Sequence, residues 1–180
     1  MIAAARLAGR ASGRVKVTLV DPKERLVQRL RLHQVATGQR VSEPAYRKLL
    51  GAKVAFVQDA AEMIDCERSR VELAGSHEPL PFDRLIYTVG SGVDLSTVPG
   101  ASEHAHSVTD LAPARGLGDA LRHLPDDALV AVVGGGMTGL EVASEIATTY
   151  PTRPVKLVTG GELGGWLSER GGECLREALA

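Results

Sequence analysis

The sequence predicts an α/β fold that combines buried parallel strands with an antiparallel β-meander. One observation is the order strand, glycine-rich turn, helix and strand within residues 128–158. A second is a helical stretch at residues 2–10 that leads through a short glycine-bearing loop into a strand at residues 15–20. A third is the composition, because 44% of the residues are apolar but only 3% are aromatic. Small aliphatic side chains of this kind suit the core of a parallel sheet.

Composition and charge exclude several classes of protein. The chain has 180 residues, which fits one globular domain or two small ones. Its 21 Lys and Arg against 22 Asp and Glu give a formal net charge of −1, and the basic residues are scattered among the acidic ones. We therefore expect no nucleic-acid partner and no cationic protein surface that would bind a membrane. No apolar run reaches the roughly 18 residues of a spanning helix, so no transmembrane segment is expected.

The N-terminus and the cysteines bear on the cellular location. The apolar opening stretch is interrupted at Arg6 and Arg10, and no signal-peptide cleavage site follows it. Cys66 and Cys174 make no disulfide framework, and unpaired cysteines agree with a reducing compartment. We therefore expect a cytoplasmic protein. The sequence leaves the oligomeric state open.

The first half of the chain is expected to hold half of a βαβ unit, followed by the meander. The strand at residues 15–20 closes at Asp21-Pro22 and would be the second strand of that unit, whose first strand is not in the sequence. Residues 23–50 are polar, with a short helix at residues 44–50. The strands of the antiparallel meander are expected at residues 52–58, 62–66 and 70–73.

The second half is expected to continue with a strand, a loop and two helices around the glycine-rich unit. An apolar strand is predicted at residues 85–89, followed by a connecting loop at residues 92–107. Apolar spacing predicts a helix over residues 110–124. The unit at residues 128–158 follows, and a last helix is expected from residue 166 to residue 180.

The glycines between the strand and the helix of residues 128–158 have the spacing of a dinucleotide fingerprint, Gly134-x-Gly136-x-x-Gly139. The first glycine permits a tight turn, the second lets backbone N–H groups approach a pyrophosphate, and the third lets the helix pack close to the strand. The positive end of the helix would then face the phosphates. The alternative is a glycine-rich structural turn in an unrelated α/β protein.

An acidic residue that would bind an adenosine ribose is missing from its usual place after the second strand. Thr159 stands there, with Glu162 slightly beyond. Without that carboxylate a 2′-phosphate is not repelled, so NADPH stays open beside NADH, with Arg153 or Arg170 as candidates to reach it. The alternative is that either arginine is a solvated surface charge. In the other half of the chain, Asp21 does follow a strand, where it would bind a ribose or simply form an Asp-Pro turn.

With these features the sequence resembles the pyridine nucleotide-disulfide oxidoreductase superfamily, and within it the type II NADH dehydrogenase-like (AIF/FSP1-like) flavoproteins. The resemblance spans nearly the whole chain and implies a Rossmann-like FAD/NAD(P)-binding fold with an antiparallel β-meander. Members begin with a further strand and glycine loop and continue beyond the nicotinamide loop, so the fold is expected to be incomplete at both termini. The residues that carry the resemblance, in the family's order, are 17–22, 29–38, 82–91 and 132–145.

The resemblance also implies site residues. Asp21 matches the acid that binds the FAD adenosine ribose. Gly90 ends the strand that passes near the flavin, although the family's usual Ala-Thr-Gly reads Thr88-Val89-Gly90 here. Glu141 matches a glutamate that the family places toward the nicotinamide end. The residues that match the nicotinamide dinucleotide loop are Gly134, Gly136, Met137, Thr138 and Gly139.

The implied reaction is hydride transfer from NAD(P)H to FAD, with electrons passing on to a small-molecule acceptor such as a quinone. Because the two cofactors carry this chemistry, no catalytic side chain is assigned. His33, His104 and His106 are interpreted as surface residues, and no metal site is expected. Residues 22–50 lack the C-x₄-C pair of the disulfide reductases, so thiol-disulfide chemistry is not expected.

Two partial domains follow from the resemblance. Residues 1–125 would form a partial FAD-binding domain without its first strand and GxGxxG, and residues 126–180 a partial NAD(P)-binding domain. The favoured function is an FAD-dependent NAD(P)H oxidoreductase. The alternative is an inactive fragment or nucleotide-binding remnant without enzymatic activity.

Overall fold

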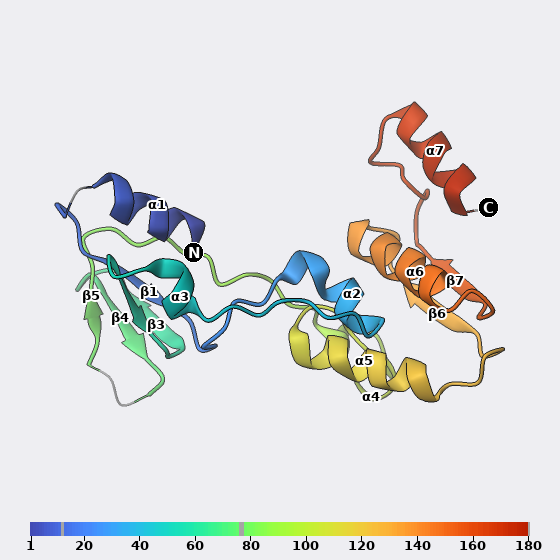
Figure 1. Ribbon diagram of the computed structural model, residues 1–180, viewed down its shortest axis with the longest axis horizontal. Coiled ribbons are helices and arrows are strands. Elements are labelled where there is room, and N and C mark those ends of the chain that lie inside the picture. The colour runs from blue at the N-terminus through green and yellow to red at the C-terminus, as the bar shows by residue number, and fades with distance from the viewer. Residues whose placement is uncertain (12, 76–77, 180) are drawn as a thin grey trace. The chain divides into compact units, whose positions relative to one another are not determined.

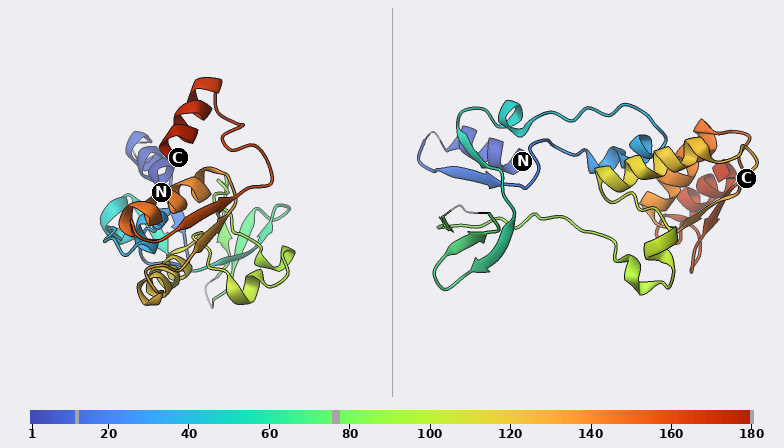
Figure 2. Two further views of the ribbon diagram at one scale, coloured as in Figure 1. Left: turned by 90° about the vertical axis from the view of Figure 1, so that its right-hand side faces the viewer. Right: turned by 90° about the horizontal axis from the view of Figure 1, so that it is seen from below.

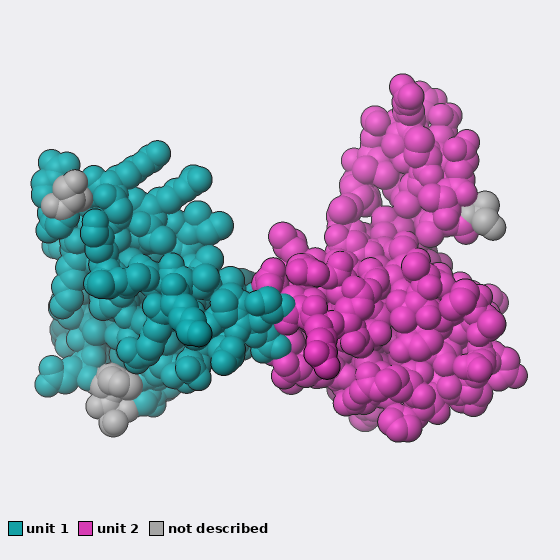
Figure 3. Space-filling view, viewed as in Figure 1, with its two compact units in different colours: residues 1–27, 42–90 teal, residues 28–41, 91–180 magenta. Residues whose placement is uncertain are grey.

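The computed structural model describes residues 1–11, 13–75 and 78–179. Contacts divide the chain into two compact units, residues 1–27 with 42–90 and residues 28–41 with 91–180 (Figure 3). Each unit contains one pair of parallel strands, and the first also contains an antiparallel sheet. The predicted α/β class is therefore confirmed. The predicted domain boundary after residue 125 stays a prediction.

The first unit packs helices onto its pair of parallel strands. Helix α1 (Ile2–Arg10) contacts β1 (Val17–Val20), which pairs in parallel with β2 (Val54–Val57) (Figures 1 and 2). Helix α3 (Tyr46–Leu50) precedes β2 and closes the same core. The buried residues of this core are Ala8, Tyr46, Leu50 and Val54.

The antiparallel sheet consists of β3 (Ala61–Asp65), β4 (Arg70–Leu73) and β5 (Leu80–Pro81). It confirms a meander and a strand within residues 52–58, but the prediction that this strand belongs to the meander is wrong. That run is β2, and it pairs with β1 instead. The reason is the long connection between β1 and β2, since a crossover of a dozen or more residues lets two strands run parallel.

A second correction concerns residues 85–89, which the sequence predicts as a strand. They have no strand partner among the residues that the structure describes. The four large apolar side chains of this run are between 43% and 68% exposed. Because a strand is defined by its ladder of backbone hydrogen bonds, apolar composition alone does not make one. The run ends at Gly90, whose φ is 82°.

The second unit is built around a strand, helix and strand, as predicted. Strand β6 (Val130–Val133) pairs in parallel with β7 (Val155–Val158), and α6 (Met137–Thr149) contacts both (Figure 1). Helix α5 (Leu111–His123) begins at the N-cap Asp110 and contributes Leu121 to the core. The other buried members of that core are Val142 and Ile146 of α6.

Several short elements of the second unit are not apparent in the sequence. Helix α2 (Leu32–Ala36) follows the 3₁₀ turn η1 (Arg29–Arg31), and both lie in the stretch read as polar. The predicted loop at residues 92–107 contains η2 (Leu95–Thr97) and α4 (Ala101–His104). The last helix, α7, spans Glu169–Leu179 and so begins later than predicted. Within the described residues, no helix is long and apolar enough to cross a membrane.

Candidate functional site

The glycine loop joins the end of β6 to the start of α6, and its own packing requires two of its glycines. Gly134 has a φ of 118°, a conformation that side chains disfavour. A Cβ atom at Gly139 would lie 1.8 Å from the carbonyl oxygen of Gly134. These two glycines therefore allow the turn and let α6 approach the end of β6 closely.

Gly136 differs from its neighbours because no contact with a described residue requires it to be a glycine. A Cβ atom there would meet no described atom within 4 Å, and its φ of −79° suits any residue. Gly136 is the N-cap of α6, and the first turn of that helix carries no acidic residue. Its N-terminal N–H groups thus have no side-chain acceptor from the cap and present the positive end of the helix dipole. The residues present fit an anionic group such as a dinucleotide phosphate.

Gly135 is a further glycine that the packing of the loop requires and that the spacing argument overlooks. A Cβ atom at Gly135 would lie 2.5 Å from Oγ1 and 2.7 Å from Cβ of Thr159, the residue directly after β7. Thr159 also accepts a hydrogen bond from the N–H of Gly161, at 3.4 Å. The uninterrupted run of three glycines is the signal that could have indicated this contact. The structure therefore packs a neutral side chain onto the loop where a ribose-binding acid is usual.

Arg153 does not occupy the place expected of a residue that recognises a 2′-phosphate, and that suggestion is wrong. Its side chain is buried, and its guanidinium donates hydrogen bonds to the carbonyl oxygens of Leu121 and Leu124, each at 3.0 Å. It precedes β7, whereas the glycine loop follows β6. Since β6 and β7 are parallel, Arg153 lies near the N-terminal ends of the two strands, whereas the loop lies at their C-terminal ends. Arg170 is exposed on α7 and remains a candidate.

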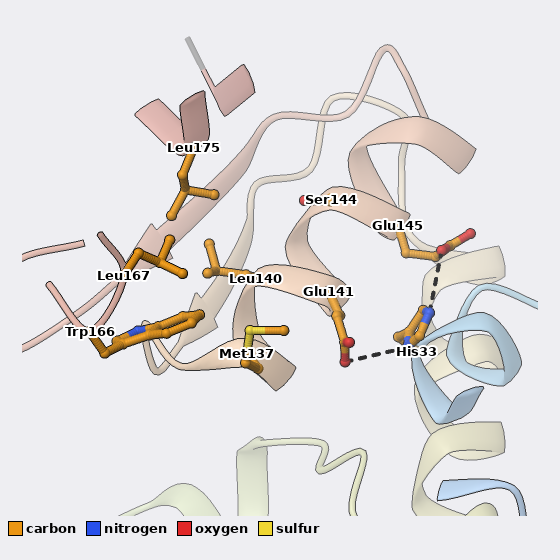
Figure 4. A pocket seen from close by; sticks show the side chains of 9 residues that line it. All are labelled: His33, Met137, Leu140, Glu141, Ser144, Glu145, Trp166, Leu167 and Leu175. Atoms are coloured by element: carbon orange, nitrogen blue, oxygen red, sulfur yellow. Dashed lines mark ion pairs between the residues drawn. The ribbon is translucent and has the colours of Figure 1, made fainter. Parts of the chain in front are cut away.

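A pocket of about 400 Å³ borders the outer face of α6 and combines an apolar part with an acidic part (Figure 4). Two of the predicted site residues, Met137 and Glu141, line it. The apolar part comes from α6 and from the chain after β7. The lining residues are His33, Met137, Leu140, Glu141, Ser144, Glu145, Trp166, Leu167 and Leu175.

His33 lies between two carboxylates of α6 in this pocket, and its interpretation as a surface residue is wrong. Its Nδ1 is 3.7 Å from Oε2 of Glu141, and its Nε2 is 3.8 Å from Oε2 of Glu145 (Figure 4). Its side chain is only 15% exposed. Gln39 donates a hydrogen bond from its amide to Oε1 of Glu145. By contrast, His104 and His106 are exposed, as predicted.

Asp21, at the end of β1, is held by two hydrogen bonds. Its Oδ1 accepts from the backbone N–H of Lys23 at 2.8 Å, and its Oδ2 accepts from the Tyr46 hydroxyl at 3.0 Å. Burial, followed by the hydrogen bond and charge of Asp21, raises the pKa of Tyr46 from 10.0 to about 12. The bond to Lys23 is the turn expected of Asp-Pro. Carboxylate oxygens accept more than one hydrogen bond, so ribose binding by Asp21 stays a prediction.

The remaining candidates give no second site. Cys66 and Cys174 are free and exposed. Among the described residues, no group of three or more His, Cys, Asp or Glu side chains could hold a metal ion. Gly90 is exposed at the end of the extended run 85–89, and its predicted contact with a flavin stays a prediction.

Comparison with known protein families identifies the family of the chain. The pyridine nucleotide-disulphide oxidoreductase family matches residues 1–162, which is most of the chain. The chain belongs to this family. The assignment confirms the oxidoreductase family predicted from the sequence, and the name of that family specifies a pyridine nucleotide, the class to which NAD(P)H belongs.

Individual relatives within and near the family match parts of the chain. Ferroptosis suppressor protein 1 of Homo sapiens is 35% identical over 103 residues, covering 57% of this chain and 26% of that protein. NADH dehydrogenase-like protein YutJ of Bacillus subtilis is 32% identical over 100 residues, covering 56% of this chain and 28% of that protein. Demethylphylloquinone reductase NdbB of Synechocystis is 26% identical over 142 residues, covering 73% and 35%. The matches thus cover between 26% and 35% of these relatives' lengths.

Solved structures confirm the Rossmann-like fold. NDH2 from Plasmodium falciparum in complex with NADH has a TM-score of 0.78 at 21% identity, covering 96% of this chain and 43% of that one. The sulfide:quinone oxidoreductase of Aquifex aeolicus has a TM-score of 0.74 at 18% identity, covering 97% of this chain and 46% of that one. At these identities the likeness shows the fold alone.

Proposed function

We propose that the chain is part of an FAD-dependent NAD(P)H oxidoreductase in which residues 134–139 bind NAD(P)H. The observation that supports this most is the open space at Gly136, beside the N-terminus of α6. Gly134 and Gly139 are explained by the packing of the loop, whereas no described contact explains Gly136; a ligand that approaches the backbone from outside would explain it. A phosphate has the size and charge for that position.

The proposed reaction passes a hydride from NAD(P)H to FAD and then two electrons to an acceptor, and the cofactors supply this chemistry. The chain's own residues bind and orient the nucleotides. Backbone groups at Gly136 hold the pyrophosphate, Glu141 faces the nicotinamide end, and Asp21 binds the adenosine ribose of FAD. The acceptor is proposed to be a quinone, because the names of NdbB and of the Aquifex enzyme specify quinones.

A second candidate function is a nucleotide-binding module without enzymatic turnover. It is favoured by the distribution of glycine loops, since the described residues contain one G-x-G-x-x-G loop between a strand and a helix. FAD would then depend on Asp21 and Gly90 without a phosphate loop from these residues. The absorbance spectrum of the purified chain separates the two functions. Stoichiometric bound flavin supports the oxidoreductase, and a colourless protein that binds NAD(P)H supports the module.

Binding of NAD(P)H can be measured with the chain's own fluorophore. Trp166 is the sole tryptophan and lines the pocket beside Met137. We expect NAD(P)H to quench Trp166 emission in a saturable manner and Gly136→Val to abolish this, because the valine would occupy the phosphate position. Gly92→Val is the matched control, since a Cβ at Gly92 also meets nothing within 4 Å but lies outside the loop. Unchanged binding by Gly136→Val would contradict the proposal.

The cytoplasmic location is part of the same proposal. Both cysteines are free and exposed, a state that a reducing compartment preserves.

A further inference from the structure

We propose that protonated His33 neutralises Glu141 and Glu145 and thereby strengthens NAD(P)H binding at residues 134–139, so that affinity rises as pH falls. His33 would act as a positioning residue through Glu141 and would not itself contact the nucleotide. This inference rests on the proposed function, because it assigns a regulator to the same site.

The geometry places one imidazole against two carboxylates. His33 projects from α2, and the carboxylates project from successive turns of α6 (Figure 4). The two nitrogen–oxygen distances, 3.7 and 3.8 Å, are longer than a hydrogen bond between these atoms. The attraction is therefore mainly between charges, and it depends on whether the imidazole carries a proton.

The two carboxylates need such a partner. Glu141 and Glu145 are four residues apart on one helix, where like charges repel each other. Gln39 donates a hydrogen bond to Glu145 but brings no charge. In the part of the chain that the structure describes, both glutamates form an ion pair with His33.

Three arginines on α5 and η1, the elements that pack against α2 beside α6, bind partners other than His33. Arg122 pairs with Asp119 on α5, Arg31 donates to Gln34 at 2.7 Å, and Arg29 donates to the carbonyl of Ser91. The charged or titratable residues of α5 and η1 are Arg115, Asp119, Arg122, His123, Arg29 and Arg31. The carboxylates of α6 are thus the groups in ion-pair contact with His33.

The consequence for binding follows from position on α6. Glu141 stands one helical turn after Met137, the first residue of the helix that receives the phosphate. Two uncompensated carboxylates on these turns would repel an anionic ligand, whereas a cation between them removes that repulsion. Histidines in general change charge between about pH 5 and about pH 8. NADH affinity should therefore fall across this range as pH rises.

The test is a fluorescence titration of the full chain with NADH between about pH 6 and about pH 8. NADH is the probe because the 2′-phosphate of NADPH would titrate in the same range. We expect the wild-type Kd for NADH to be about three- to tenfold lower at the acidic end, because one added positive charge near an anionic ligand changes its affinity by about this factor. His33→Gln should bind as weakly at all pH values as the wild type does at alkaline pH. His33→Lys should keep tight binding throughout, because lysine supplies a permanent charge.

The controls separate this inference from the proposed function. His123→Gln removes an exposed histidine of α5 and should keep the wild-type pH dependence. Circular dichroism checks that each variant is folded, and rescue by His33→Lys excludes a purely structural role for the imidazole. If wild type binds NADH but His33→Gln retains its pH dependence, or if His33→Lys behaves as His33→Gln, the inference is overturned alone. If wild type does not bind NADH, the proposed function falls and this inference with it.

Discussion

The two parallel strand pairs of this protein differ in the side chain that follows one of their strands. In the first unit, the residue after β1 is Asp21, a carboxylate held by Lys23 and Tyr46. In the second unit, the residue after β7 is Thr159, a neutral side chain that packs on the glycine loop. The first unit thus has the carboxylate that is proposed to accept the ribose hydroxyls, and the second has the glycine loop that is proposed to hold the phosphates. The difference shows that a shared strand arrangement does not carry a shared set of side chains at the strand ends.

The largest expected effect separates glycines that the loop needs from the glycine that a ligand needs. Gly139→Ala should destabilise the second unit by about 3 kcal/mol or more, because its Cβ would overlap a backbone oxygen. Gly136→Val should change stability by less than about 1 kcal/mol and still abolish NAD(P)H binding. Urea unfolding and the Trp166 titration measure the two effects. Native stability of Gly139→Ala would show that the loop is not as tightly packed as described.

The next effect would give the second unit the carboxylate of the first. Thr159→Asp should raise the preference for NADH over NADPH about tenfold, because the new charge accepts from the ribose hydroxyls and repels a 2′-phosphate. The ratio of the two dissociation constants is the measurement. Thr159→Ser adds no charge and should leave the ratio unchanged. An equal ratio in Thr159→Asp would place the adenosine ribose away from the end of β7.

A smaller effect tests how the first unit holds its carboxylate. Folding raises the pKa of Tyr46 from 10.0 to about 12, so the folded state retains a proton that the unfolded state loses. The stabilisation is fully present below pH 10 and is lost as pH rises through about 12. Tyr46→Phe should lack this alkaline loss and be about 1 kcal/mol less stable at neutral pH. Tyr87→Phe, at an exposed tyrosine, is the control, and unfolding midpoints between these pH values are the measurement.

If Asp21 binds the FAD ribose, Asp21→Ala in a flavin-loaded protein should weaken FAD retention by about 1.5–3 kcal/mol while the fold persists. Flavin released on dialysis measures this. Retention equal to wild type would leave Asp21 with its turn-forming role only.

The smallest expected effect concerns the cysteines. Cys66→Ser and Cys174→Ser should change stability by less than about 0.5 kcal/mol and leave NAD(P)H binding unaltered, because both side chains are exposed and free. A reductase activity that Cys66→Ser abolishes would contradict the absence of thiol chemistry.

The sequence predicts the strand, helix and strand of residues 128–158 better than the rest of the chain, because the pattern of that segment is local. The glycine spacing, the apolar strand before it and the helical period after it all lie within residues 128–158. By contrast, α2 depends on burial of Leu32, Val35 and Ala36 against elements far along the chain. The partner of β2 and the exposure of residues 85–89 also depend on which strands lie alongside, which an apolar run does not specify.

The candidate site likewise has residues whose roles the sequence predicts and residues whose roles it does not. The roles of Gly134 and Gly139 follow from local backbone geometry, and sequence spacing predicts them. The environment of His33 could not be predicted, because its two carboxylates belong to a helix more than one hundred residues later. Arg153 failed as a candidate for a similar reason, since its partners lie at the end of α5.

Arg153 also determines how much of this protein would have to be moved to transfer the nucleotide loop to another scaffold. Its guanidinium lies 4.5 Å from the ring of Tyr150, after α6, and binds carbonyl oxygens at the end of α5. A single-nitrogen lysine could not span those separate acceptors. A graft limited to β6, α6 and β7 would therefore leave a buried cation without its acceptors. The smallest transplantable piece has to begin upstream of β6, with the end of α5.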